Sequence, residues 1–225
     1  MEPHEFWQTI EPAAQVGSEF ATSFPVHLSD GRILRLPIRT LADGRHGLAS
    51  LIINQASFSV QAELSGALAE RLAPFAPEVV VGLPTLGLTL AGPVAQALGH
   101  SRYVPLGTSR KFWYDEALSV PLSSITTEAE KRLYIDPRLL PLISGRRVAL
   151  VDDVISSGRS MSAALKLLGK LGVEPVVIGA AMLQTRAWQQ ALATTGERLP
   201  DRVRGVFSTP RLVRTATGTW RAEEA

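Results

Sequence analysis

Short apolar runs alternate along most of the chain with segments whose apolar residues are spaced as on one face of a helix. The apolar runs predict strands over 79–81, 102–105, 147–151, 175–183 and 203–207. The amphipathic segments predict helices over 58–72, 88–98, 161–171 and 185–193. Strands that alternate with helices in this way are typical of an α/β fold, in which helices cover both faces of a parallel sheet. Ligands of such folds bind at the carboxyl ends of the strands.

The N-terminal part has a different pattern. Strands are predicted over 24–28 and 33–38, joined by Asp30-Gly31, whose residues tolerate the positive φ angles of a tight hairpin turn. Proline within both strands favours a position at a sheet edge. A further strand is predicted over 48–53, and one or two short helices within residues 4–22.

These patterns divide the chain into three parts. We expect residues 1–55 to form a small hood with a helix and the β-hairpin, and residues 56–207 to form the α/β core. Residues 208–225 form a C-terminal tail that could belong to the hood.

The segment from Arg147 to Ser160 carries the clearest chemical signal. A buried strand is followed by Asp152 and Asp153, then by a loop of small residues, then by a helix. The start of a helix offers free N–H groups and partial positive charge to an anion. Serines 156, 157 and 160 add hydroxyl donors, Gly158 allows close approach of the backbone, and the carboxylates can accept hydrogen bonds from ribose hydroxyls. Together they predict a sugar-phosphate site; the alternative is an ordinary capped helix.

A second strand, loop and helix span residues 79–92. The spacing of Gly82 and Gly87 is similar to that of a Walker A loop, but Leu88 stands where that motif needs lysine. No G-x-G-x-x-G motif follows a strand, which weakens a dinucleotide interpretation. A tight turn without a ligand is the alternative to an anion-binding loop here.

The 147–160 segment resembles the phosphoribosyl pyrophosphate (PRPP) signature of the type I phosphoribosyltransferases, and the chain looks closest to the adenine and xanthine enzymes over about residues 50–190. The resemblance implies that Asp152 and Asp153 contact the ribose hydroxyls, with Mg²⁺ nearby. It assigns the 5′-phosphate to Ser156, Ser157, Gly158, Arg159 and Ser160, although many members have a small residue in place of Arg159. It assigns pyrophosphate to the backbone of Pro84, Thr85, Leu86 and Gly87.

Residues 108–118 are too long for a simple connection, and they combine cations with three adjacent aromatic residues. In the same family a mobile catalytic loop lies here, and Arg110 and Lys111 match its pyrophosphate-binding pair. The alternative is a surface hairpin whose aromatic residues pack on the core or on a dimer partner. The resemblance also assigns Asn54 and Gln55, weakly, to base recognition, where turn chemistry is the alternative.

Composition excludes several classes of function. The chain has no cysteine, which rules out disulfides and thiolate chemistry, and its four histidines are too scattered for a metal site. A net charge of +2 without a long Lys/Arg run argues against a nucleic-acid partner. The chain shows neither a signal peptide nor an apolar run of membrane-spanning length, so we expect a cytoplasmic protein without a membrane partner.

The resemblance thus implies an enzyme that transfers 5-phosphoribosyl from PRPP to a nitrogen of a nucleobase or similar heterocycle, in purine salvage, with Mg²⁺ as cofactor. A homodimer is expected. One alternative is a regulator that senses PRPP and keeps the site without catalysis; a non-catalytic interaction domain is another. The acceptor base is not identifiable from these residues.

Overall fold

The computed structural model describes residues 2–122 and 131–223. Its centre is a five-stranded parallel sheet, as predicted, with the strand order β11-β10-β9-β5-β6. The strands are β5 (Val79–Gly82), β6 (Val104–Pro105), β9 (Val148–Ile155), β10 (Val177–Gln184) and β11 (Val203–Thr209).

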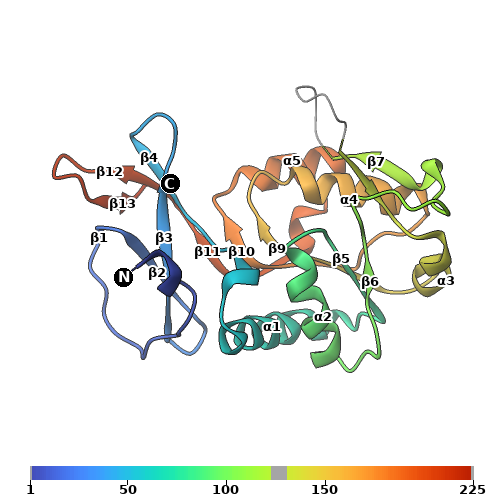
Figure 1. Ribbon diagram of the computed structural model, residues 1–225, viewed down its shortest axis with the longest axis horizontal. Coiled ribbons are helices and arrows are strands. Elements are labelled where there is room, and N and C mark those ends of the chain that lie inside the picture. Colours follow the sequence, from blue (N-terminus) through green and yellow to red (C-terminus); the bar gives the residue numbers. More distant parts are fainter. Residues whose placement is uncertain (1, 123–130, 224–225) are drawn as a thin grey trace.

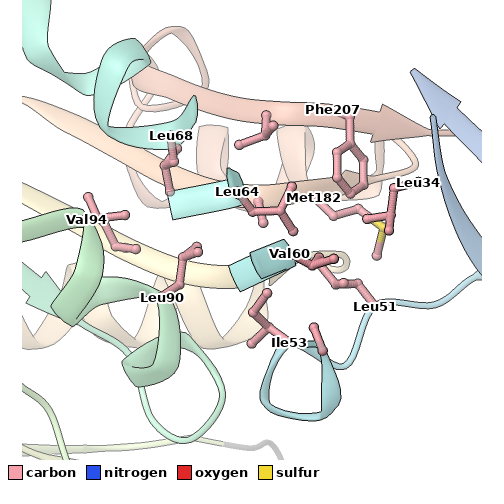
Figure 2. Close-up of a cluster of buried hydrophobic side chains, with 14 of the residues drawn as sticks. Leu34, Leu51, Ile53, Val60, Leu64, Leu68, Leu90, Val94, Met182 and Phe207 are labelled. Carbon is pink, nitrogen blue, oxygen red and sulfur yellow. The ribbon is translucent and has the colours of Figure 1, made fainter. Parts of the chain in front are cut away.

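Helices cover both faces of this sheet (Figure 1). One face carries α1 (Phe58–Leu72), whose bounds match the prediction, and α2 (Gly87–Ala97); the other carries α4 (Arg159–Lys170) and α5 (Ala187–Thr195). Alternate residues of each strand point to opposite faces, so Val80 packs in the α1/α2 cluster and Val81 in the α4/α5 cluster. Figure 2 shows the first cluster, where Leu64 lies near Met182, Leu90 lies near Val94, and Leu34 of the hood also joins.

A six-stranded antiparallel sheet forms the hood, in the order β1-β13-β12-β4-β3-β2. Its strands are β1 (Glu19–Phe20), β2 (Ser23–His27), β3 (Ile33–Thr40), β4 (His46–Ala49), β12 (Arg211–Arg214) and β13 (Trp220–Ala222). The predicted hairpin is present as β2 and β3, and Pro25 lies in the edge strand β2. The edge position expected for the second strand was wrong: β3, which contains Pro37, lies between β2 and β4. Because β12 pairs with β4 and β13 pairs with β1, segments from both ends of the chain build the hood together.

The remaining elements are short. A two-stranded ribbon of β7 (Ser119–Pro121) and β8 (Arg132–Tyr134) packs against α4. The other elements are α3 (Leu140–Ile143) and 3₁₀ turns η1 (Pro3–Glu5), η2 (Ile53–Gln55), η3 (Ala73–Phe75), η4 (Glu116–Leu118), η5 (Pro137–Leu139) and η6 (Pro200–Arg202). No helix within the described residues is both long and apolar enough to cross a membrane.

Two further predictions in the N-terminal part were wrong. Residues 4–22 form no α-helix: after the turn η1, residues 6–18 form no helix, and Glu11 pairs with the backbone of Ile33 in an isolated bridge. Prolines 3 and 12 disfavour a continuous helix here, and the Glu11 backbone forms its hydrogen bonds with Ile33 at the start of β3 instead. The strand predicted over 48–53 is β4, which ends at Ala49 and is followed by η2.

Candidate functional site

The two adjacent acids lie inside β9, whose strand continues to Ile155 instead of ending at residue 151 as predicted. Asp152 stands opposite Ala180 of β10, in the carboxyl-terminal half of the strand. Both carboxylates are buried, each residue being 8% exposed. The Asp153 backbone N–H donates to Asp152 Oδ1 at 2.9 Å, which fixes the first carboxylate against the strand.

Burial raises the pKa of Asp152 well above its usual value, and the neighbouring Asp153 carboxylate raises it further. Burial also raises the pKa of Asp153. Among the described residues no basic side chain forms an ion pair with either acid. A pair of buried carboxylates in this state favours either a proton or a cation from outside the chain.

The serine-rich loop follows directly and leads into α4. A cavity of about 100 Å³ lies there, lined by Asp152 and residues 154–161. That is about three times the ~30 Å³ that one water occupies in the liquid, a size that suits a single phosphate group. The first N–H groups of the twelve-residue helix α4 and the exposed Ser157 and Ser160 surround the place where such an anion would lie.

The structure gives a reason for glycine at position 158 that the sequence did not show. Gly158 precedes α4 with φ of +77°, which favours glycine, and a Cβ atom there would lie 3.0 Å from Ala191 Cβ and 3.2 Å from the Trp188 backbone of α5. Its missing side chain therefore lets α4 and α5 approach each other. A larger residue at 158 would disturb this packing whether or not an anion binds the loop.

A buried side chain holds the serine-rich loop to the hood. The Ser156 hydroxyl donates to Gln184 Oε1 at 2.7 Å, and Gln184 Nε2 donates to the Ala49 carbonyl at 2.6 Å. Gln184 is 6% exposed at the end of β10, so these bonds are protected from water. The only sequence signal for this role was a polar residue that ends an apolar run.

The predicted first loop adjoins the acid pair. The Leu83 N–H donates to the Val151 carbonyl at 2.9 Å, and the peptide bond between Pro84 and Thr85 is cis. Gly87 then starts α2, and a Cβ atom on it would lie 2.5 Å from Asp152 Oδ1 and 2.9 Å from Asp152 Cα. The structure thus brings residues 84–87 and 152–160 together at one edge of the sheet.

The predicted catalytic segment is anchored through its aromatic residues. Trp113 Nε1 donates to Asp136 Oδ2 at 3.2 Å, and the Arg138 guanidinium lies over the indole at 4.4 Å from the ring centroid. Arg138 also holds the pKa of Asp136 below its usual value. Arg110 Nε lies 3.6 Å from Glu116 Oε2, and the Lys111 side chain is exposed. Within the described residues, no hydrogen bond or ion pair joins either cation to the acid pair.

Asn54 and Gln55 lie in η2, which packs against α2. Both side chains are exposed, and the Gln55 carbonyl accepts a hydrogen bond from Gln8 Nε2 at 2.8 Å. This geometry is that of a surface turn, and it places both residues on the α2 side of the hood–core junction.

A larger cavity, of about 720 Å³, opens between the hood and the carboxyl ends of β10 and β11. We call it the hood cavity. Ser156 lines both this cavity and the smaller one at α4, so the two adjoin. Its hood wall comes from Leu41, Leu48, Arg211 and Glu223. The sequence did not indicate the hood wall, because residues so far apart in the chain meet only through the pairing of β12 with β4.

Comparison with known proteins agrees with this geometry. A family model described as a phosphoribosyl transferase domain matches residues 49–194. A xanthine phosphoribosyltransferase of Chloroflexus aurantiacus is 31% identical over 128 residues, which cover 55% of this chain and 56% of that protein. A transcriptional regulator, GfcR, of Archaeoglobus fulgidus is 38% identical over 93 residues, 40% of each chain. The chain thus spans only about half the length of these curated relatives.

Among solved structures, the adenine phosphoribosyltransferase of Giardia lamblia in complex with 9-deazaadenine is 18% identical. It superposes with a TM-score of 0.56 over 83% of this chain and 93% of that one, a likeness of fold. The family match covers well over half of the chain, including both loops and the acid pair. The chain belongs to the phosphoribosyl transferase domain family.

Proposed function

We propose that the protein binds PRPP and transfers its 5-phosphoribosyl group to a ring nitrogen of a nucleobase-like heterocycle. The observation that carries this proposal is the contact between Gly87 and Asp152, which joins a loop suited to pyrophosphate with a buried acid pair suited to ribose. The phosphate-sized cavity at the start of α4 adjoins the same acids. One edge of the sheet therefore offers places for all three parts of PRPP.

In this proposal each region of the site has one task. Serines 157 and 160 and the first N–H groups of α4 hold the 5′-phosphate, and the backbone of residues 84–87 at the start of α2 holds pyrophosphate. Asp152 and Asp153 accept hydrogen bonds from the ribose hydroxyls, and their negative charge opposes the positive charge that develops on the ribose. Gln184 keeps Ser156 and hence the loop in place.

The acid pair also fits the Mg²⁺ that we propose as cofactor. The described residues contain no cluster of three or more potential ligands. Two carboxylates without a basic partner match the way proteins bind this ion, through one or two carboxylates together with substrate phosphates and waters. Asp152 and Asp153 are the residues that would hold it. Bound Mg²⁺ would supply charge neutralisation for pyrophosphate.

The proposed reaction forms one bond and breaks another. The lone pair of the acceptor nitrogen forms a bond to the ribose C1′, while the bond from C1′ to the pyrophosphate oxygen breaks and its electron pair leaves with pyrophosphate. A proton carried by the acceptor nitrogen passes to water. We place the acceptor in the hood cavity, which adjoins the phosphate site at Ser156. Arg110 and Lys111 would stabilise the leaving pyrophosphate once segment 108–118 moves toward it.

Calorimetric titration with PRPP and Mg²⁺ tests the donor site. We expect binding by the parent protein and none by the double variant Asp152→Asn with Asp153→Asn, whose uncharged amides keep the shape of the strand. Release of pyrophosphate that depends on an added base then tests transfer. Equal PRPP binding by parent and double variant would contradict the proposal.

A PRPP-sensing regulator is the second candidate, favoured by the similarity to the regulator GfcR. The same assays separate the two functions. Binding of PRPP without release of pyrophosphate, across a panel of purine, pyrimidine and pyridine acceptors, would support the regulator and contradict the transferase.

We also propose a homodimer. The support is the exposure of two large aromatic side chains, Phe58 at 88% and Phe112 at 94%. Light scattering coupled to size-exclusion chromatography should give a mass near twice the 24.3 kDa of the chain. A mass equal to that of one chain at micromolar concentration would contradict this.

A further inference from the structure

The hood cavity is larger than a bare base requires. Its volume of about 720 Å³ lies within the roughly 300–1,000 Å³ of sites that take drug-sized ligands. The wall is largely apolar, with Leu48 on the hood side and with Leu183 and Trp188 on the core side. Trp188 Nε1 donates to the Thr185 carbonyl at 3.1 Å, which fixes the indole. These features suit a flat aromatic ring that carries a substituent.

The charge of the lining indicates the kind of substituent. Arg211 Nε and Nη2 donate to Glu223 Oε2 and Oε1 at 2.5 and 2.7 Å, so these two side chains neutralise each other. Arg186 follows β10 and is exposed at the cavity wall, and its side chain forms no hydrogen bond or ion pair within the described part of the chain. The lining therefore keeps one uncompensated positive charge.

A second observation points to a ligand in the same cavity. The Thr209 hydroxyl is buried, the residue being 3% exposed, and it has no hydrogen-bond partner among the described residues. A buried polar group without a partner costs about 1–3 kcal/mol. Thr209 lies at the end of β11 on the cavity wall, where a polar group of a ligand could satisfy it after a small movement.

From these observations we infer that the acceptor is an aromatic nitrogen heterocycle that carries a carboxylate, which Arg186 binds. A guanidinium donates two parallel hydrogen bonds to a carboxylate, and the negative charge of the acceptor makes these bonds stronger than those to a neutral base. This inference rests on the proposed function, in which the ring nitrogen attacks C1′ as pyrophosphate leaves. The carboxylate takes no part in bond formation and serves only recognition.

Matched pairs of compounds test it by binding alone. Nicotinate and nicotinamide share one ring, and orotate differs from uracil by its carboxylate. Calorimetry with the full chain, without and with PRPP, should show at least tenfold tighter binding of the acid in one of these pairs. Arg186→Met should abolish the preference for the acid and leave the affinity for the neutral compound unchanged. Arg186→Lys should keep part of the preference. Arg198→Met, at an exposed arginine outside the cavity, is the control and should have no effect.

The outcomes separate this inference from the proposed function. If PRPP fails to bind but the preference for the acid depends on Arg186, the proposed transferase function is wrong and the inference of an acidic ligand is supported. Normal PRPP binding with no preference for either acid would overturn the acidic ligand alone. A preference that survives Arg186→Met would also overturn it.

Discussion

Gly87 lies directly against Asp152, so that the space of its missing side chain is occupied by the carboxylate and the backbone of β9. We expect Gly87→Ala to weaken PRPP binding at least tenfold. Alanine normally stabilises a helix by about 0.5–1 kcal/mol over glycine, but a Cβ atom 2.5 Å from Asp152 Oδ1 must displace α2 or the carboxylate. Overpacking of this kind costs about 1–3 kcal/mol, so the unfolding free energy should fall as well.

Gly92→Ala is the matched control for that change. Gly92 lies in the same helix, and a Cβ atom there would meet Tyr103 at an ordinary contact distance of 3.4 Å. It should leave PRPP affinity unchanged. Equal affinity losses from both variants would mean that α2 as a whole, and not its contact with Asp152, determines binding.

Asp152→Asn should make the protein more stable at pH 7 while it removes PRPP binding. The folded-state pKa of Asp152 is raised, so the charged carboxylate lowers stability as pH rises above its unfolded pKa of about 4. Each kcal/mol regained would raise the melting temperature by about 2–4 °C in a chain of this size. Melting curves at pH 7 and pH 4 should show that the gain shrinks at the lower pH.

Asp136→Asn should change stability in the opposite direction and make the protein less stable at pH 7. The pKa of Asp136 is lowered by Arg138, so the carboxylate contributes stability that is present above the unfolded pKa and is lost as pH falls through the lower folded pKa. This variant should therefore melt below the parent at pH 7. If the Asp152→Asn variant also melts below the parent at pH 7, interactions within the folded chain must already offset the free-energy cost of burying the Asp152 carboxylate.

Gln184→Met should weaken both the hood and the serine-rich loop. Methionine keeps the length of the side chain but loses the bonds to Ser156 and to the Ala49 carbonyl, which should lower the unfolding free energy by about 1–3 kcal/mol. Ribose 5-phosphate should also bind less tightly. In a double-mutant cycle, Gln184→Met and Ser156→Ala should show a coupling free energy of about 0.5–3 kcal/mol. Ser160→Ala, at an exposed serine, is the control and should show no coupling with Gln184→Met.

Lys111→Ala should reduce kcat at least tenfold, about 1.4 kcal/mol of barrier, with a smaller effect on PRPP affinity. A cation directed at the leaving pyrophosphate acts mainly as charge develops. Lys166→Ala, on the exposed side of α4, provides the control and should match the parent. Unchanged kcat and affinity in Lys111→Ala would make segment 108–118 a structural hairpin anchored by Trp113.

Local patterns predicted the parallel core well, because its helices and strands are short and regular. The bounds of α1 are those expected from helical spacing. The end of β9 was placed too early because two acids interrupt the apolar run, although Val154 and Ile155 still pair with β10. Polar residues within an apolar run therefore do not by themselves mark the end of a strand.

The hood and the packing of the site depended on contacts between distant segments. Nothing near Arg211 or Trp220 in sequence shows that these strands pair with β4 and β1. Likewise, the residue types of the two loops were visible, but the contact of Gly87 with Asp152 and the bridge through Gln184 depend on how neighbouring strands are aligned. Periodicity carries no information on such pairing.

The pairing of β1 with β13 has a consequence for the order of folding. Thr219 Oγ1 donates to Glu19 Oε2 at 2.6 Å across 200 residues of sequence, so this part of the hood sheet joins segments that are separated in sequence by the whole parallel core. Contacts of such long range form slowly. The parallel sheet depends on pairing over shorter range, so the wall formed by Arg211 and Glu223 should close after it in folding. If the proposed function is correct, a folding intermediate that has the parallel sheet but lacks this wall should bind PRPP before it can hold an acceptor.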